Sequence, residues 1–433
     1  MTTAPPSGAP PRPARTARKP AWPEPSPTRV PAPEAAPAPP VRRTPLVVAA
    51  VLGVALTAYV WTVHGTKPGI LLLLGTGLGV GLFHSRFGFT SAWRQLVAVG
   101  NGAGLRAHAL LLGTTATLFA LLIGTGTGLF GTTPVPSAGP LGVGLLAGAF
   151  LFAAGMQIGG ACASGTLFAV GSGQSTIVLT LGGFIAGSTL AAWQYGLWRD
   201  LPAFEPVLFS DGLGWPGSLA LTLALLALVV LVSRRVQARR NPPPVGTPPS
   251  ARGALARTVR GSWPLAAGAV VLAVLGAGVL LVSGGAWGVT SAFALWGSKL
   301  VGVLGGSPET WTYWQEPGNA VQLSGPVLAD KTSLTDIGIM IGAALAAAGG
   351  GVWTLHRSVP WRRALGAVLG GLLMGVGARL AGGCNIGAYL AGIASGSLHG
   401  WIWAAAAMLG TFAGLKLRPL FKLGNPTPRD GVC

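Results

Sequence analysis

Charged residues are scarce in this chain. Only 9% of its 433 residues are Asp, Glu, Lys or Arg, while half are apolar. A soluble domain usually has about 25% charged residues. The apolar residues gather in runs of about 17–23, long enough to cross a hydrocarbon core of roughly 30 Å. This pattern excludes an ordinary soluble domain and predicts an all-α polytopic membrane protein.

Cysteine is equally rare, with Cys162, Cys384 and Cys433 only. Their spacing fits neither a disulfide framework nor a zinc site, and no His-Cys cluster suits another metal. Nothing resembles a Walker motif, so we expect no direct use of ATP and no cofactor. No cleavable signal peptide is recognised near the N-terminus. Cys433 is interpreted as an idle tail thiol.

Acidic residues are the least common charged type, which leaves a net charge of +19. The basic residues cluster at 12–43, 234–260 and 416–429, beside apolar runs, and the positive-inside rule places such clusters in the cytoplasm. Nucleic-acid binding would need a folded basic face, and the sequence gives no sign of one. The acids outside the tails are predicted to lie in loops on the outer side: Asp200, Glu205, Asp211, Glu309, Glu316, Asp330 and Asp336.

About nine or ten transmembrane helices are predicted. The apolar segments cover 46–63, 69–84, 108–130, 141–158, 176–197, 216–233, 263–283, 336–356, 361–380 and 399–417. We divide the chain into a disordered cytoplasmic tail (1–45), an N-terminal membrane half (46–233), a basic cytoplasmic linker (234–262), a C-terminal membrane half (263–417) and a cytoplasmic tail (418–433). With six crossings before the linker and four after it, both termini are expected in the cytoplasm.

Two pairs of short motifs repeat between the halves. The Thr-Ser-Ala motifs are Arg86-Phe-Gly-Phe-Thr-Ser-Ala92 and Ala286-Trp-Gly-Val-Thr-Ser-Ala292. The cysteine motifs, at 155–165 and 377–387, share Gly-x-x-x-x-Gly-x-Cys-x-x-Gly. On the expected topology the two repeats are inverted. Short, glycine-interrupted segments at matching positions mark the binding site of inverted-repeat transporters, so we predict re-entrant or broken helices around a central site.

The residue types in these motifs suit a small anion. Half-helix N-termini offer N–H groups and a positive dipole end. The candidate path residues are Cys162, Cys384, Gly160, Gly165, Gly383, Gly387, Asn385, Thr90 and Thr290. No acid is expected near any motif. Arg379 is either a site residue or a side chain that extends to the outer interface. The cysteines are buried hydrophobes, weak donors to a soft anion, or nucleophilic thiolates.

The cysteine motifs, together with Trp287-Gly-Val-Thr-Ser, resemble the YeeE/YedE sulphur-transport family of bacterial inner-membrane proteins, over about residues 69–417. The resemblance implies an hourglass-like protein that takes up thiosulfate, with Cys162 and Cys384 at its narrow waist. One departure is Gly88, which stands where thiosulfate-transporting members typically have a further cysteine.

We therefore expect a membrane transporter or channel, and not an enzyme, for thiosulfate or a related small sulfur-containing anion. The alternative is a membrane-bound sulfurtransferase-like protein that relays sulfane sulfur as a cysteine persulfide. The expected partners are the anion, the lipid bilayer and a soluble cytoplasmic sulfur carrier or sulfurtransferase. The expected location is the bacterial inner membrane.

Overall fold

The structure, a computed structural model, describes residues 39–242, 253–355 and 359–426. Cys433, most of the N-terminal tail and part of the linker lie outside these residues. The described residues are 76% helical, and they contain one two-stranded antiparallel pairing, β1 (Leu141–Gly142) with β2 (Ala203–Phe204). The prediction of an all-α polytopic protein is confirmed.

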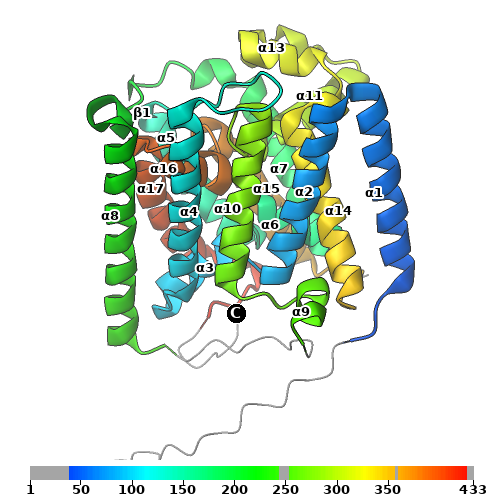
Figure 1. Cartoon of the computed structure of the whole chain (residues 1–433), viewed down its shortest axis with the longest axis horizontal. Helices are drawn as coiled ribbons and strands as arrows, with labels where there is room; N and C mark the ends of the chain where they lie inside the picture. Colours follow the sequence, from blue (N-terminus) through cyan, green and yellow to red (C-terminus); the bar gives the residue numbers. More distant parts are fainter. Residues whose placement is uncertain (1–38, 243–252, 356–358, 427–433) are drawn as a thin grey trace, which may run out of the picture. The chain divides into compact units, whose positions relative to one another are not determined.

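Ten helices of the described part are long and apolar enough to cross a membrane (Figure 1). They are α1 (Arg43–His64), α2 (Thr66–Ser85), α4 (Ala103–Thr125), α5 (Val143–Gly159), α7 (Ser175–Trp193), α8 (Phe209–Arg240), α10 (Leu265–Ser283), α14 (Lys331–Gly349), α15 (Trp361–Leu380) and α17 (Leu398–Leu417). Each overlaps one predicted apolar segment. Part of the predicted linker is helical, because α8 extends to Arg240 and α9 (Ala254–Arg260) follows.

Shorter helices begin at the four repeated motifs. They are α3 (Phe89–Val99), α6 (Ala163–Gly171), α11 (Thr290–Val303) and a π-helix, η4 (Asn385–Leu390), that continues into α16 (Ala391–Ala394). At 1.5 Å per residue they measure about 14–21 Å, too short to cross the hydrocarbon core alone. The small outer elements are η1 (Tyr195–Leu197), η2 (Pro308–Thr310), α12 (Thr312–Gln315), α13 (Pro317–Ser324) and η3 (Val327–Ala329), and η5 (Arg418–Phe421) follows α17.

The helix contacts have approximate two-fold symmetry. In each half the order of the main helices is long, long, short, long, long, short, long. The equivalent pairs are α1 and α8, α2 and α10, α3 and α11, α4 and α14, α5 and α15, α6 and η4 with α16, and α7 and α17. Helix α7 packs on α15 as α17 packs on α5, and α14 packs on α2 as α4 packs on α10. Helices α1 and α8 run in opposite directions (Figure 1). The repeat thus includes α1 and α8, which contain neither of the repeated motifs.

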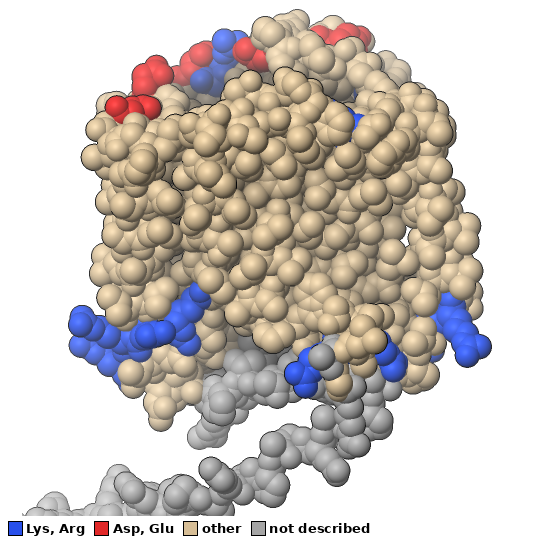
Figure 2. Space-filling view, in the orientation of Figure 1, with Lys and Arg blue, Asp and Glu red and all other residues tan. Residues whose placement is uncertain are grey.

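Surface charge is separated between the two ends of the helical bundle. The acidic side chains gather at one end and most of the basic side chains at the other (Figure 2). Helix α8 links these ends, because it has Asp211 in its first turn and Arg239 and Arg240 in its last. This is the distribution that the positive-inside rule describes.

Glycines let the paired helices approach closely. In α7 a Cβ on Gly183 would lie 2.4 Å from the Val368 carbonyl oxygen of α15, whereas a Cβ on neighbouring Gly182 would meet nothing within 4 Å. The backbones of α7 and α15 are therefore in contact at Gly183, and small residues at such contacts hold membrane helices together.

This contrast gives a matched pair of variants. We expect Gly183→Ala to cost about 1–3 kcal/mol through overpacking, and so to lower the temperature of thermal unfolding in detergent. Gly182→Ala adds the same methyl group to the same helix without a clash, and should leave the unfolding temperature unchanged or raise it. Equal effects of the two variants would contradict the described packing of α7 on α15.

Candidate functional site

Each of the two buried cysteines caps a short helix. Cys162 is the N-cap of α6, and its Sγ accepts a hydrogen bond from Gly165 N at 3.4 Å. Cys384 is the N-cap of η4, and its Sγ accepts one from Ile386 N, also at 3.4 Å. The sulfurs take the place that an oxygen holds in an ordinary N-cap. Both thiols thus lie at the positive end of a short helix.

A left-handed residue precedes each cysteine by two positions. Gly160 has φ 89° and Gly382 has φ 68°, values that glycine adopts without strain. Both glycines are exposed, whereas Cys162 and Cys384 are buried. Two residues before each cysteine the backbone is therefore exposed, whereas the thiol itself is buried. Gly160 was predicted as a path residue, while Gly383 had been chosen in place of Gly382.

The cysteine motifs of the two halves lie together. Helix α6 contacts η4, and Cys384 interacts electrostatically with Cys162. Both sulfurs belong to the same buried cluster. The structure therefore brings two cysteines that are 222 positions apart in the sequence into one buried region.

The predicted glycines serve different purposes. A Cβ on Gly165 would lie 3.2 Å from Cys162 Sγ, so this glycine leaves room for the thiol. A Cβ on Gly383 would lie 2.8 Å from Ala388 N, so this glycine allows the chain to fold back onto η4. A Cβ on Gly387 would meet nothing within 4 Å, and Gly387 borders open space.

A polar side chain in each half joins the cysteine motif to the Thr-Ser-Ala motif. Gln157 and Arg379 each stand five residues before their cysteine. Gln157 Nε2 donates to the Thr90 carbonyl oxygen at 3.3 Å, and Arg379 Nη2 donates to Thr290 Oγ1 at 3.0 Å. Arg379 Nη1 also donates to the Tyr313 hydroxyl at 2.6 Å. The guanidinium is thus bound to neighbouring helices, where the sequence left open whether it extends to the outer interface.

Several polar atoms in these motifs are buried and lack a hydrogen-bond partner among the described residues. They are Thr90 Oγ1, Trp287 Nε1, Arg379 Nε and both amide atoms of Asn385. Buried polar groups are normally paired, and an unpaired one needs an explanation such as an absent ligand. Asn385 is next to Cys384 in the sequence, so its amide is a neutral donor and acceptor close to that thiol.

One expectation about the acids was wrong. Asp336 was predicted in an outer loop, and no acid was expected near any motif. The structure places Asp336 inside α14, fully buried, where it interacts electrostatically with Cys384. The apolar segment predicted at 336–356 begins five residues earlier than expected, so that the polar start of α14 lies within the protein.

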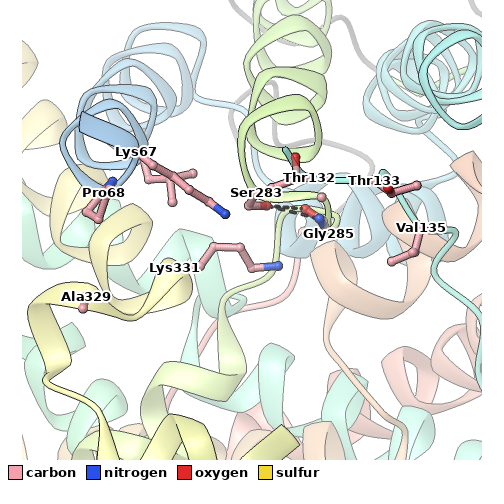
Figure 3. Close-up of a pocket in the computed structure, with 11 residues that line it drawn as sticks. Lys67, Pro68, Thr132, Thr133, Val135, Ser283, Gly285, Ala329 and Lys331 are labelled. Carbon is pink, nitrogen blue, oxygen red and sulfur yellow. Dashed lines mark hydrogen bonds between the residues drawn. The ribbon is translucent and has the colours of Figure 1, made fainter. Parts of the chain in front are cut away.

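An open cavity of about 740 Å³ lies at the acidic end. Lys67 of α2 and Lys331 of α14 extend their amines toward the same space (Figure 3). Lys331 Nζ donates to the Ala286 carbonyl oxygen at 3.1 Å, at the start of the second Thr-Ser-Ala motif. The hydroxyl groups of Thr132, Thr133 and Ser283 belong to residues of the same wall. Sequence analysis missed this feature, because Lys67 and Lys331 meet only in the folded chain.

Gly88 occupies a position equivalent to those of the two cysteines. It is the N-cap of α3, as Cys162 and Cys384 are the N-caps of their short helices. A Cβ on Gly88 would lie 2.8 Å from Ser91 Oγ, the movable end of a small side chain. The third cysteine implied by the resemblance would therefore cap a third short helix.

Comparison with known proteins gives a consistent result. The model of the family described as Sulphur transport matches residues 84–413. The thiosulfate transporter TsuA of Spirochaeta thermophila is 29% identical over 354 residues, which cover 79% of this chain and 96% of that protein. The probable transporter YedE of Escherichia coli is 32% identical over 173 residues, 37% of this chain.

The relatives differ in how much of their length is matched. The chain spans 41% of the length of the YedE proteins of Escherichia coli and Salmonella typhimurium. The family model, in contrast, covers both Thr-Ser-Ala motifs and both cysteine motifs. The chain belongs to the Sulphur transport family of membrane proteins.

Proposed function

We propose that this protein carries thiosulfate, or a related small sulfur-containing anion, into the cytoplasm through a constriction at Cys162 and Cys384. The observation that carries the proposal is the contact between the two cysteine motifs, one from each half, with both thiols buried. The amide of Asn385, beside Cys384, has no hydrogen-bond partner among the described residues. A soluble cytoplasmic sulfur carrier or sulfurtransferase is the proposed recipient of the sulfur.

The chemistry of the constriction favours weak, transient contacts. A thiol is a weak hydrogen-bond donor, and Asn385, next to Cys384, is neutral. Such groups lower the cost of taking an anion out of water without binding it too tightly to leave. The helix N-termini at the cysteines add partial positive charge. A soft sulfur anion suits this site better than a hard oxyanion of the same charge.

The proposed orientation follows from the charges. The basic end, which holds the Arg-rich end of α8, would face the cytoplasm in the inner membrane, and so would both termini. The cavity lined by Lys67 and Lys331, here called the lysine cavity, would then be the outer entrance.

The growth of bacteria that lack sulfate assimilation tests the function: expression of the protein should restore growth on thiosulfate. Failure of an expressed, membrane-inserted protein to restore growth on any sulfur anion would contradict the proposal.

A persulfide relay is the other candidate, and burial of the sulfurs weighs against it. Cys162 is 2% exposed and Cys384 is 0% exposed, so a soluble acceptor could not reach either thiol in this conformation. Mass spectrometry separates the two functions. Passage without covalent chemistry leaves both cysteines unmodified after incubation with thiosulfate, whereas a relay leaves an added sulfur atom on one of them.

The lysine cavity is expected to raise the local concentration of anions at the entrance. A charged cleft of this kind increases capture, and salt screens its effect. Lys67→Gln should therefore raise the KM for thiosulfate several-fold with little change in maximal rate, and the difference from wild type should shrink at high ionic strength. The measurement is initial uptake into liposomes as a function of concentration.

Lys416→Gln is the matched control, because Lys416 is an exposed lysine of α17 at the basic end of the bundle. It should leave the KM unchanged. An equal change of KM in both variants would show that net charge, and not the cavity, controls capture.

A further inference from the structure

Asp336 is a buried acid that the proposed path does not use. Its side chain is 0% exposed, and neither carboxyl oxygen has a hydrogen-bond partner among the described residues. A buried carboxylate without a partner is costly, and the group avoids that cost by binding a proton. An ionisable residue inside a membrane segment is a candidate for proton relay. The surroundings of Asp336 therefore favour the neutral acid in this conformation.

Asp336 lies on a part of α14 that packs against helices of the site. Thr332, Asp336 and Met340 are spaced by four residues, so they share one face of α14. On this face Ser291 Oγ of α11 donates to Thr332 Oγ1 at 2.9 Å, and the Met340 carbonyl oxygen lies against Gly171 of α6. Asp336 is thus flanked by the helices of one Thr-Ser-Ala motif and one cysteine motif, and it interacts with Cys384.

The other half has a titratable residue at the same place. His108 is the sixth residue of α4, as Asp336 is of α14, and α4 and α14 are equivalent in the repeat. His108 is also buried, but Trp93 Nε1 donates to its Nδ1 at 3.3 Å. The ring of His108 packs against Phe87 and Phe89. The histidine is held as a neutral acceptor, whereas the acid is left without a partner.

Among the residues that the structure describes, no other ionisable group around α14 hydrogen-bonds to the carboxyl group. Its electrostatic neighbours are Asp330 and Cys384. The titratable or charged residues on the elements that pack against α14 are Lys67 and His84 of α2, Arg43, Tyr59 and His64 of α1, Lys299 of α11, Arg257 and Arg260 of α9, and Cys162 at the start of α6; α14 itself adds Lys331.

We propose that Asp336 is a proton-binding site beside the anion path, and that a proton enters with each anion that passes. This inference rests on the proposed function. A membrane potential that is negative inside opposes the entry of an anion, and a proton that moves with the anion offsets part of that opposition. The carboxyl group takes its proton when the outer cavity is open to it, and releases the proton when the site opens to the cytoplasm.

The test uses the full-length protein in liposomes that contain a pH-sensitive dye, with labelled thiosulfate outside. We expect wild-type uptake to acidify the interior and to accelerate as the external pH is lowered. Asp336→Asn keeps the size of the side chain but cannot titrate. We expect it to retain downhill uptake, to lose the acidification, and to have an uptake rate independent of pH. Asp211→Asn, at an exposed acid of α8, is the matched control and should behave as wild type.

Two results would overturn the inference: wild-type uptake without acidification, or acidification by Asp336→Asn equal to that of wild type. If Asp336→Asn does not fold, Asp336→Glu provides the second variant. It keeps a titratable carboxyl group in a longer side chain, and should keep the acidification with an altered pH profile. Failure of the wild-type protein to take up any sulfur anion would overturn the proposed function, and this inference with it.

Discussion

Replacing Cys384 or Cys162 by alanine is expected to abolish growth on thiosulfate. Each thiol is buried at the point where the two halves meet, and an alanine methyl group offers no donor to a passing anion. Loss of a single contact of this kind costs on the order of 1–3 kcal/mol, and about 1.4 kcal/mol is tenfold in rate. Initial uptake of labelled thiosulfate should therefore fall at least about fivefold in each variant.

Two controls distinguish loss of the thiol from loss of the fold. Cys433→Ala removes a thiol of the tail and should leave uptake unchanged. Cys384→Ser retains a donor of similar size at the N-cap, and its rate should lie between those of Cys384→Ala and wild type. Full growth of both alanine variants would refute a path through the cysteines.

Arg379→Gln is expected to have the second large effect. Arg379 donates to Thr290 at the start of α11 and to the hydroxyl of Tyr313, and its buried Nε has no hydrogen-bond partner within the described part of the chain. The ion pairs within the described residues are those of Arg199 with Asp200 and Glu316, so no acid there neutralises Arg379. Its loss should lower uptake at subsaturating thiosulfate by about tenfold, since a buried hydrogen bond to a charged group is worth about 1.5–3 kcal/mol.

Arg379→Lys should not restore uptake, because a single ammonium group cannot reproduce the two-pronged contact of the guanidinium. Tyr313→Phe removes one partner but keeps the charge, and its effect should be smaller. Arg363→Gln, at an exposed arginine near the other end of α15, is the control. Wild-type uptake by Arg379→Gln would show that this arginine is not needed.

Long apolar runs made the membrane helices predictable. The segment predicted at 361–380 coincides with α15, and the one predicted at 263–283 differs from α10 by two residues at its start. Some twenty consecutive apolar residues leave few alternatives to a spanning helix. The repeated motifs were equally informative, because each of them lies at the start of a short helix.

The start of α14 shows why the rest was not predicted. Its first six residues, Lys331 to Asp336, include polar and charged side chains, and hydropathy interprets such a stretch as a loop. In the folded chain residues 332–336 are buried against protein, where the packing of other helices, and not lipid, decides which residue is tolerated. The lysine cavity and the contacts of Gln157 and Arg379 could not be predicted either, because they join residues that are distant in the sequence.

Uptake of labelled thiosulfate by liposomes that contain only this protein tests the central claim most directly. Unlabelled thiosulfate, sulfate, sulfite and selenium analogues serve as competitors. The account predicts saturable uptake that soft sulfur or selenium anions inhibit more strongly than sulfate does. Uptake no faster than in protein-free liposomes for every one of these anions would contradict it.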